Sequence, residues 1–245
     1  MRIFLLAGIY AGAVGMTSYA SAADLRYPPP GPGPIPFSWS GCYAGAHAGS
    51  SAGHTTWQDP VPNGDIDATM TGQTANTDMS GALYGGQLGC DWQVDASNWV
   101  LGLRGAISGS TLTGTNMDQF NNTWALRTQT DWMGSITGRV GWSVDHVLIY
   151  GTGGVAWAHN KFEIENTAIL DGTPQATRVG WVVGGGVEWA FAPSWSVFAE
   201  ADYYNFAGKT VNFAGDLVNP TPPFAVKTAQ TVESLLFGVN YRFGH

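Results

Sequence analysis

Hydrophobic and polar residues alternate along the last segment of the chain. Every odd-numbered residue from Leu235 to Phe243 is apolar, while the even-numbered residues change from apolar to polar along the segment. A period of two places successive side chains on opposite faces of a β-strand. One face of this strand is therefore apolar and ends in Tyr241 and Phe243, and the other face becomes polar. A strand with an apolar outer face, a polar inner face and aromatic residues at the interface is typical of a lipid-embedded β-barrel.

The same alternation recurs through the chain and predicts eight strands, each long enough to cross a bilayer at the usual tilt. Their expected ranges are 39–50, 80–94, 98–109, 125–143, 147–160, 178–191, 195–206 and 229–243. The connections alternate between three short turns, at 95–97, 143–146 and 192–194, and four long polar loops, at 51–79, 110–124, 161–177 and 207–228. Short turns belong on the periplasmic side of such barrels and long loops outside. The sequence therefore predicts an all-β fold, an eight-stranded antiparallel transmembrane up-and-down barrel.

Three of the predicted strands have clearly assigned faces. Their lipid-facing positions are Ala82, Tyr84, Leu88, Cys90, Trp92 and Val94 in the second, Trp132, Ile136, Val140 and Trp142 in the fourth, and Val179, Trp181, Val183, Val187, Trp189 and Phe191 in the sixth. Their inward positions are Gln87, Asp91 and Gln93, then Asp131, Ser135, Thr137 and Arg139, then Gly180, Gly184, Gly186 and Glu188. The fifth strand alternates poorly, and its faces stay open.

Aromatic residues collect beside the predicted periplasmic turns and the C-terminus. They are Trp92, Trp99, Trp142, Trp189, Trp195, Tyr241 and Phe243. Trp and Tyr are enriched where a membrane protein meets the water interface. These residues therefore predict a periplasmic aromatic girdle.

Alternation also sends charged residues into the barrel interior. The expected set is Arg104, Arg139 and Arg242 together with Asp91, Asp131, Glu188, Glu200 and Asp202. Eight strands leave an interior just wide enough to be filled by side chains, and an isolated buried ion is very costly. We therefore predict a lumen network of ion pairs that closes the barrel to solutes of sugar size. Glu188 and Glu200 lie on either side of the turn at 192–194, so we expect them side by side with Arg139 or Arg242 between them.

The first 22 residues have a different pattern. Arg2 is followed by an apolar run over residues 3–16 and then by Ala20-Ser21-Ala22. This order predicts a secretory signal peptide, residues 1–22, that is cleaved after Ala22. The alternative is a membrane anchor, but the run is shorter than the ~20 residues that a spanning helix needs.

Residues 23–38 contain six prolines, which cannot donate backbone hydrogen bonds to a sheet or a helix. The segment is expected to be an extended periplasmic spacer, and its functional alternative is docking to the cell wall or to another envelope protein. The barrel domain then covers residues 39–243.

The amino-acid composition narrows the class of protein further. Cleavage removes one of 10 basic residues and none of the 18 acidic ones, so the mature chain has a net charge of −9 and nucleic acid is not an expected partner. Charged residues make up only 11% of the chain, which contains 34 Gly and 11 Trp. Low charge without a long apolar segment argues against a helical membrane protein and fits a barrel whose strands are half polar.

Cys42 and Cys90 are the only cysteines, and alternation places both outward near the same end of neighbouring strands. In an oxidising exported compartment they could form a disulfide. The alternative is two small apolar residues that face lipid. A metal site made of two thiols without nearby ligands is less favoured than either.

Other motifs give no enzyme, metal or cofactor. The segment from Gly151 to Ala156 matches a G-x-G-x-x-A fingerprint, but no helix follows to hold a pyrophosphate. The five histidines lack metal-ligand spacing. A lipid-acting enzyme would need a nucleophile and a base near the outer leaflet. Ser110, His54, His159 and Glu163 are available, but the sequence sets them in no recognisable arrangement.

Together these segments resemble the eight-stranded outer-membrane immunogenic proteins of Gram-negative bacteria, often described as small porins with an outer-membrane β-barrel domain. The resemblance runs through ADL at 23–25, WSGCYAG at 39–45, GGQLG at 85–89, WVLG at 99–102, GRVG at 138–141, YGTGGVA at 150–156, GGGVEW at 184–189 and GVNYRF at 238–243. The resemblance implies that the protein is located in the outer membrane. It also implies that the barrel-insertion machinery recognises the last strand with its terminal aromatic residues. Cys42 and Cys90 stand where this family would be expected to have aromatics.

The leading expectation is a surface-exposed structural barrel that stabilises the envelope. The first alternative is a small-solute porin, and the second is an outer-membrane lipid-modifying enzyme. The expected partners are the lipid bilayer, lipopolysaccharide and the insertion machinery, with the cell wall or another envelope protein as a partner of the spacer.

Overall fold

The computed structural model describes residues 37–58, 74–95, 97–117, 124–166, 169–170, 175–213 and 224–243. The predicted signal peptide and residues 23–36 of the predicted spacer lie outside them. The strands of this part are β1 (Gly41–Gln58), β2 (Thr74–Gln93), β3 (Trp99–Met117), β4 (Trp124–Val144), β5 (Val147–Asn166), β6 (Ile169–Leu170), β7 (Gln175–Ala192), β8 (Trp195–Phe213) and β9 (Phe224–Phe243). Among these residues, no helix is long and apolar enough to span a membrane.

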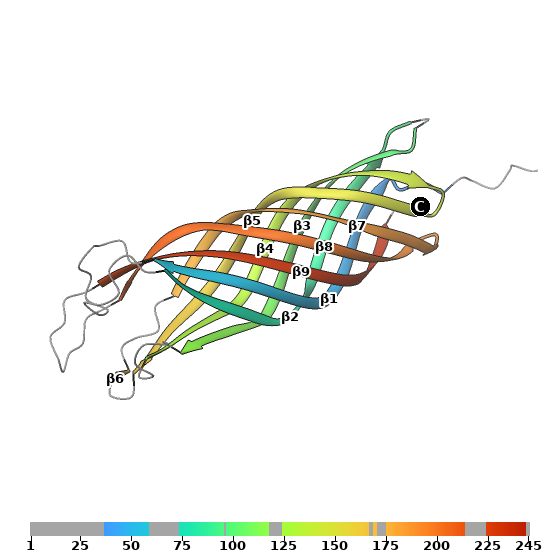
Figure 1. Cartoon of the computed structure of the whole chain (residues 1–245). Coiled ribbons are helices and arrows are strands. Elements are labelled where there is room, and N and C mark those ends of the chain that lie inside the picture. The colour runs from blue at the N-terminus through green and yellow to red at the C-terminus, as the bar shows by residue number, and fades with distance from the viewer. Residues whose placement is uncertain are drawn as a thin grey trace, which may run out of the picture. The chain divides into compact units, whose positions relative to one another are not determined.

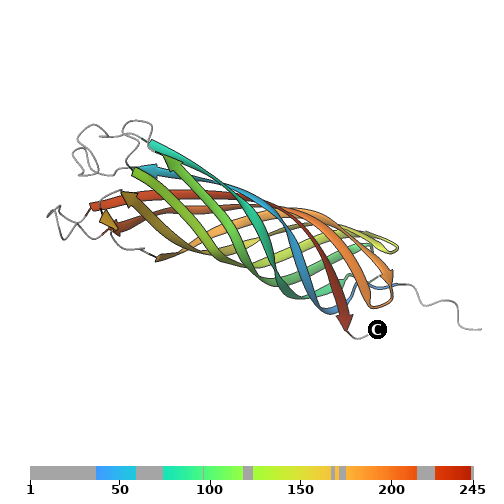
Figure 2. The same ribbon diagram turned by 90° about the horizontal axis from the view of Figure 1, so that it is seen from below.

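Eight of these strands close into a barrel (Figure 1). Each pairs antiparallel with its neighbours in the chain, with β5 pairing directly with β7, and β1 pairs with β9 to complete the ring. The two-residue β6 pairs only with β5 and is not part of the wall. Seen from below, the strands cross the barrel obliquely, as closure of a sheet requires (Figure 2). The predicted eight-stranded antiparallel barrel is confirmed.

The two ends of the barrel differ in their connections. Tight turns join β2 to β3, β4 to β5 and β7 to β8, and we call this end the turn end. In one of these turns Asp145 has a φ of 54°, a left-handed conformation that Asp tolerates better than most residues. The opposite end, which carries the long connections, is called the loop end.

The strands reach further towards the loop end than the alternation predicts. β1 ends at Gln58 rather than near residue 50, and β8 ends at Phe213 rather than near residue 206. Backbone pairing continues in these extensions, for example between Trp57 and Thr228. A strand that extends beyond the lipid does not need an apolar face. The alternation of apolar and polar residues therefore ends before the backbone hydrogen bonding between the strands does.

Side-chain burial follows the faces predicted for the second, fourth and sixth strands, except at Asp131 of β4. Leu88 and Trp92 of β2 are 66% and 61% exposed, whereas Gln87 and Asp91 of the same strand are buried. In β5, whose faces stayed open, Leu148 and Tyr150 point inward and Ile149 outward. The alternation is weak there because the inward positions are apolar as well.

Candidate functional site

The interior of the barrel is the part of the molecule that decides its function, and it is filled in layers. At the turn end Trp39 lies in an apolar cluster with Val100, Leu148, Tyr150 and Ala190 and is 0% exposed. Its backbone N–H donates to Oε1 of Gln93 at 3.0 Å, and its indole N–H donates to the Asp145 carbonyl at 3.3 Å. The segment that precedes β1 therefore closes this mouth of the barrel.

Trp39 was expected to begin the first strand, and its closing position was missed. The alternation could have predicted this inward position. Trp39 is separated from the inward-facing Tyr43 by an even number of residues, so both side chains are expected on the same face. Phe37 extends the same closure, because its ring contacts those of Trp39 and His146 at centroid distances of 5.2 and 4.9 Å.

The next layer is an ion-pair network centred on Asp91. Oδ2 of Asp91 accepts hydrogen bonds from Arg139 at 3.2 Å and from Arg242 at 3.0 Å. Arg139 also pairs with Glu188. The other oxygen of Glu188 accepts from the Ser196 hydroxyl at 2.6 Å and from the Asn240 amide at 3.0 Å. Four strands thus hold two buried arginines against two buried carboxylates.

A second ion pair follows further along the axis. Arg104 binds Glu200 through both of its terminal nitrogens, one of them at 2.6 Å. The Tyr150 hydroxyl donates to the same carboxylate at 2.7 Å. Asp202 lies two residues along β8 on the same buried face, next to Glu200, and among the described residues no arginine forms an ion pair with it. Together the two layers set three arginines against four carboxylates.

Aromatic rings fill the space between these charges. The guanidinium carbon of Arg139 lies 3.7 Å from the centre of the Tyr150 ring. That of Arg242 lies 5.2 Å from the centre of Tyr43 and 5.3 Å from that of Trp39. These are cation–π distances. The arginines are therefore fixed by packing as well as by charge, and Arg242 joins the network to the closing Trp39, whose carbonyl oxygen also accepts from it.

A small cavity adjoins the second ion pair. It measures about 20 Å³ and is lined by residues that include His47, Ser108, Arg104 and Glu200. Nε2 of His47 lies 2.7 Å from the Ser108 hydroxyl. The volume accommodates one water molecule, since about 10–15 Å³ is the minimum.

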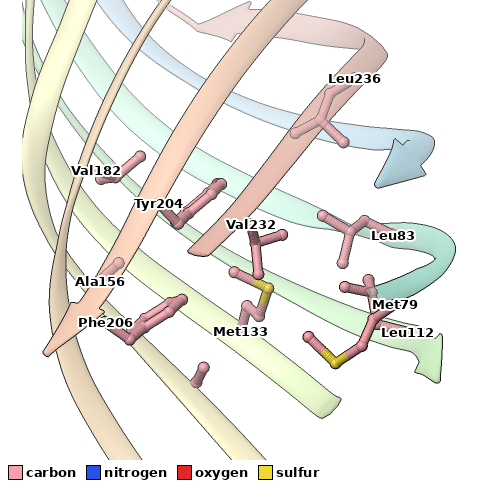
Figure 3. Packing of buried hydrophobic residues seen from close by; sticks show 11 residues of the cluster. Met79, Leu83, Leu112, Met133, Ala156, Val182, Tyr204, Phe206, Val232 and Leu236 are labelled. Carbon is pink, nitrogen blue, oxygen red and sulfur yellow. The ribbon is translucent and has the colours of Figure 1, made fainter. Parts of the chain in front are cut away.

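An apolar layer fills the interior on the loop-end side of the charges (Figure 3). Its side chains point into the barrel from every wall strand except β1, and they are Met79, Leu83, Leu112, Met133, Ala156, Ala158, Val182, Tyr204, Phe206, Val232 and Leu236. The sequence predicted a plug made of ion pairs, and this apolar layer was not expected. Its residues are apolar at inward positions, as Leu236 is in the closing strand, so they weaken the alternation of apolar and polar residues.

Beyond the apolar layer lies a ring of uncharged polar side chains. The Thr130 hydroxyl donates to Asn160 at 2.9 Å, Asn160 donates to Gln230 at 2.6 Å, and Gln230 donates back to Thr130 at 3.3 Å. All three residues are buried. Their mutual hydrogen bonds satisfy polar groups that would be costly to bury alone.

Two expectations about the lumen charges are wrong. Asp131 lies at a β-bulge between Thr130 and Trp132, which removes it from the inward phase of β4. It pairs instead with Lys161 at 2.8 Å, on the half-exposed outer side of the wall. Asp131 is therefore not part of the lumen network.

Glu188 and Glu200 do not lie side by side. Glu188 lies closer to the turn than Glu200 does, and an irregularity between Ala190 and Ala192 shifts the register by one residue more, so that Glu188 faces Phe198 and Glu200 faces Gly186. Each carboxylate consequently has its own arginine, Arg139 for Glu188 and Arg104 for Glu200. A bulge beside a tight turn leaves no signal in residue spacing.

The structure places aromatic side chains on the outer surface at both ends of the apolar belt. At the turn end lie the girdle residues Trp92, Trp99, Trp142, Trp189, Trp195, Tyr241 and Phe243, all exposed. Towards the loop end, the rings of Trp181 and Tyr203 lie 5.6 Å apart, and Trp132 stacks on His159 at 5.8 Å. Two girdles separated by an apolar belt match the two interfaces of a bilayer.

Cys42 and Cys90 face each other across β1 and β2 and are bonded as a disulfide on the outer surface near the turn end. We expect oxidised protein to take up no alkyl groups when it is treated with iodoacetamide without reductant, as measured by intact mass. Reduced protein is the control and should gain two. A gain of two groups without reductant would mean that both thiols are free.

The residues considered for an enzyme are not brought together. Ser110 is buried, and its hydroxyl accepts from the Leu112 backbone N–H at 3.1 Å. His54 is exposed and pairs with Asp78, and His159 stacks on Trp132. The Glu163 side chain lies outside the described residues. Within the described part of the chain, no group of three or more His, Cys, Asp or Glu side chains could hold a metal ion.

A closed barrel with an apolar outer belt between two aromatic girdles and a filled interior is an outer-membrane β-barrel. Residues 37–243 match the family described as outer membrane protein beta-barrel domain, and the chain belongs to this family. The predicted resemblance and the predicted location, the outer membrane of a Gram-negative bacterium, are thereby confirmed.

The chain is also similar to named outer-membrane proteins. The 31 kDa outer-membrane immunogenic protein of Brucella melitensis is 27% identical over 99% of this chain and 100% of its own length. The 25 kDa outer-membrane immunogenic protein of Brucella canis is 24% identical over 96% of both chains. Among solved structures, the outer membrane protein OprG from Pseudomonas aeruginosa has a TM-score of 0.49 at 12% identity, over 85% of this chain and 100% of its own.

Proposed function

We propose that the protein is a closed structural barrel that stabilises the outer membrane and presents its loop end to the surroundings. The observation that carries this proposal is the filled interior: an apolar closure, two charged layers, an apolar layer and a polar ring follow one another along the axis. A water-filled channel needs a continuous polar path, and two apolar layers interrupt it here.

The charged layers add a second reason. A passing solute would have to separate Arg139 from Glu188 or Arg104 from Glu200, whose side chains are almost completely buried. Breaking a buried pair typically costs about 3–5 kcal/mol. The opening would also have to displace the bulky side chains of the apolar layer, so a stable open state is not expected.

Planar-bilayer recording tests this proposal directly. We expect the refolded protein to give no steady conductance step under conditions in which a general porin, used as the positive control, conducts. Insertion is checked independently by heat-modifiable migration of protein recovered from the same vesicles. A large, steady open state of folded protein would reject the closed barrel and favour the alternative, a small-solute porin.

We further propose that the protein has no lipid-modifying activity of its own. The separation of Ser110, inside the barrel, from His54, on its outer surface, supports this proposal. Incubation of the refolded protein with lipopolysaccharide or phospholipid should leave the lipid mass unchanged. Loss of an acyl chain that depends on Ser110 would contradict it.

A further inference from the structure

The Cys42–Cys90 disulfide lies on the part of the outer surface that faces lipid. A row of directly paired residues crosses four strands here, and its members are Phe243, Cys42, Cys90 and Leu103. Phe243 belongs to the girdle at the turn end, and Leu103 is an exposed residue of the apolar belt. Both cysteines are exposed on the same surface. The bond therefore lies where the girdle meets the belt, on the membrane side of Trp92.

The side chains around the bond are apolar. Leu88 and Trp92 flank Cys90 on the outer face of β2, and both are exposed. The next residue after Cys42 on the outer face of β1 is Ala44. Neither β1 nor β2 contains a Lys or Arg, so neither strand supplies a cation that would stabilise a thiolate. In the membrane, acyl chains rather than water therefore cover the two sulfur atoms.

A disulfide forms by exchange, and each step of the exchange needs a thiolate. The thiolate of one cysteine attacks the disulfide of an oxidant, which gives a mixed disulfide and releases one thiolate of the oxidant. The thiolate of the second cysteine then attacks the sulfur of the first, so that the Cys42–Cys90 bond forms and the oxidant leaves as a dithiol. The two cysteines lose two electrons and two protons, and the oxidant gains them.

Neither step suits the inserted barrel. An unpaired ion is very costly in an apolar environment, so the hydrocarbon suppresses the attacking thiolate. A soluble oxidant would also have to bring its own disulfide past Phe243 and Trp92 into the lipid. In the aqueous periplasm, before the barrel forms, both obstacles are absent.

The position of β1 gives an early bond a role in assembly. β1 pairs with β2 and with β9, the last strand of the chain, so it lacks one neighbour until the barrel closes. Of the described residues in β1, none belongs to the interior apolar layer. The outer face between Cys42 and His54 bears only Ala and Ser side chains. A covalent link to β2 therefore holds a strand with few side-chain contacts in its native register until β9 pairs with it.

We propose that the Cys42–Cys90 bond is made in the periplasm, by exchange with the disulfide of a soluble thiol oxidase, before the chain enters the outer membrane. The inserted barrel neither forms nor exchanges the bond. The chain is thus a substrate of a protein that donates its own disulfide, and this reaction precedes assembly of the barrel. The inference depends on the outer-membrane location and not on whether the lumen is closed.

The first test compares the mature chain outside and inside a bilayer. Reduced protein is kept in urea or refolded into phosphatidylcholine vesicles, and oxidised glutathione is then added. Samples are quenched with acid, unfolded and alkylated, and their intact mass reports the bond. We expect the inserted chain to form it at least about tenfold more slowly, because the rate follows access and the thiolate fraction. Equal rates would overturn the proposal.

Two single-thiol variants control for the vesicles and for urea. Cys42→Ser leaves only Cys90, and Asn98→Cys combined with Cys42→Ser and Cys90→Ser places one thiol in the exposed turn between β2 and β3. Insertion should slow mixed-disulfide formation with glutathione about tenfold or more at Cys90, but by less than about threefold in the turn. Heat-modifiable migration confirms that each variant is folded. Equal slowing at both positions would contradict the protection of the bond by lipid.

A chain that does not refold when reduced is tested in the reverse direction. The oxidised barrel in vesicles should lose the bond to reduced glutathione at least about tenfold more slowly than the oxidised chain in urea. Loss at the same rate would show that the inserted bond is open to exchange, and the proposal would fail.

Pulse-chase labelling tests the order of events in cells. Chains that have become heat-modifiable should already carry the bond, and its formation should slow in cells that lack their periplasmic thiol oxidase. Heat-modifiable chains with free thiols that become oxidised during the chase would overturn the proposed order. An unchanged rate without the oxidase would overturn the proposed partner.

Discussion

Replacing Arg139 with alanine is expected to destabilise the folded barrel by about 3 kcal/mol or more. Arg139 bonds both Asp91 and Glu188, and all three side chains are almost completely buried. Without it, Glu188 keeps only Ser196, Asn240 and a distant Arg242, whose nearest nitrogen is 3.9 Å away. A buried carboxylate without a close cation is costly. Urea unfolding in lipid vesicles would measure the loss of free energy.

Lys161→Ala is the matched control for this experiment. It also removes the cation of an ion pair, but the pair with Asp131 is partly exposed to solvent. Exposed pairs typically contribute about 0–1 kcal/mol, so the control should unfold nearly like the wild type. Arg242→Ala should resemble Arg139→Ala, because Arg242 binds Asp91 and the Trp39 carbonyl. An Arg139→Ala protein as stable as the Lys161→Ala protein would contradict the proposed role of the network.

Deleting residues 239–245 should prevent assembly of the barrel. Val239, Tyr241 and Phe243 pair with β1 on one side, and the first two also pair with β8 on the other, so the deletion opens the ring at its closing strand. Unpaired strand edges are not tolerated in the hydrocarbon region. Outer-membrane fractions should then contain no heat-modifiable form of the truncated protein.

The double substitution Tyr241→Ala and Phe243→Ala separates closure from recognition. It keeps the backbone of β9 and removes only the terminal aromatic side chains, which lie 5.1 Å apart on the outer surface. If the insertion machinery reads these aromatics, this variant should fold in vesicles but reach the outer membrane of cells poorly. Recovery of the truncated protein in a folded state would refute the requirement for the closing strand.

The sequence predicts the fold well because two of its signals arise from the membrane itself. Lipid requires an apolar outer face, which produces the alternation of apolar and polar residues around Leu88 and Trp92. Because the chain crosses the membrane with each strand, short turns lie on one side and long loops on the other. The same alternation predicts which charged side chains point inward. Asp91, Arg139 and Glu188 lie at inward positions and contact one another in the lumen.

The remaining features lack such a signal. The bulge that turns Asp131 outward and the register shift between Ala190 and Ala192 each displace the pairing by one residue, which the spacing of residues in the sequence does not record. The strand extensions lie beyond lipid, where no apolar face is needed. The interior apolar layer places apolar residues at inward positions as well. This weakens the alternation of apolar and polar residues, as in β5, so the layer cannot be recognised from that alternation.

The lumen network also has a consequence for how the wall assembles. Each of the eight wall strands contributes a member to it or to its immediate partners: Tyr43, Asp91, Arg104, Arg139, Tyr150, Glu188, Glu200 and Arg242 in chain order. A strand that slipped by one residue would turn its charge or hydroxyl into the hydrocarbon, and a slip by two residues would separate it from its partner. The three lumen arginines reach their carboxylate partners only when all strands are in their native register, so the charges that fill the lumen also select one alignment of the wall among its competitors.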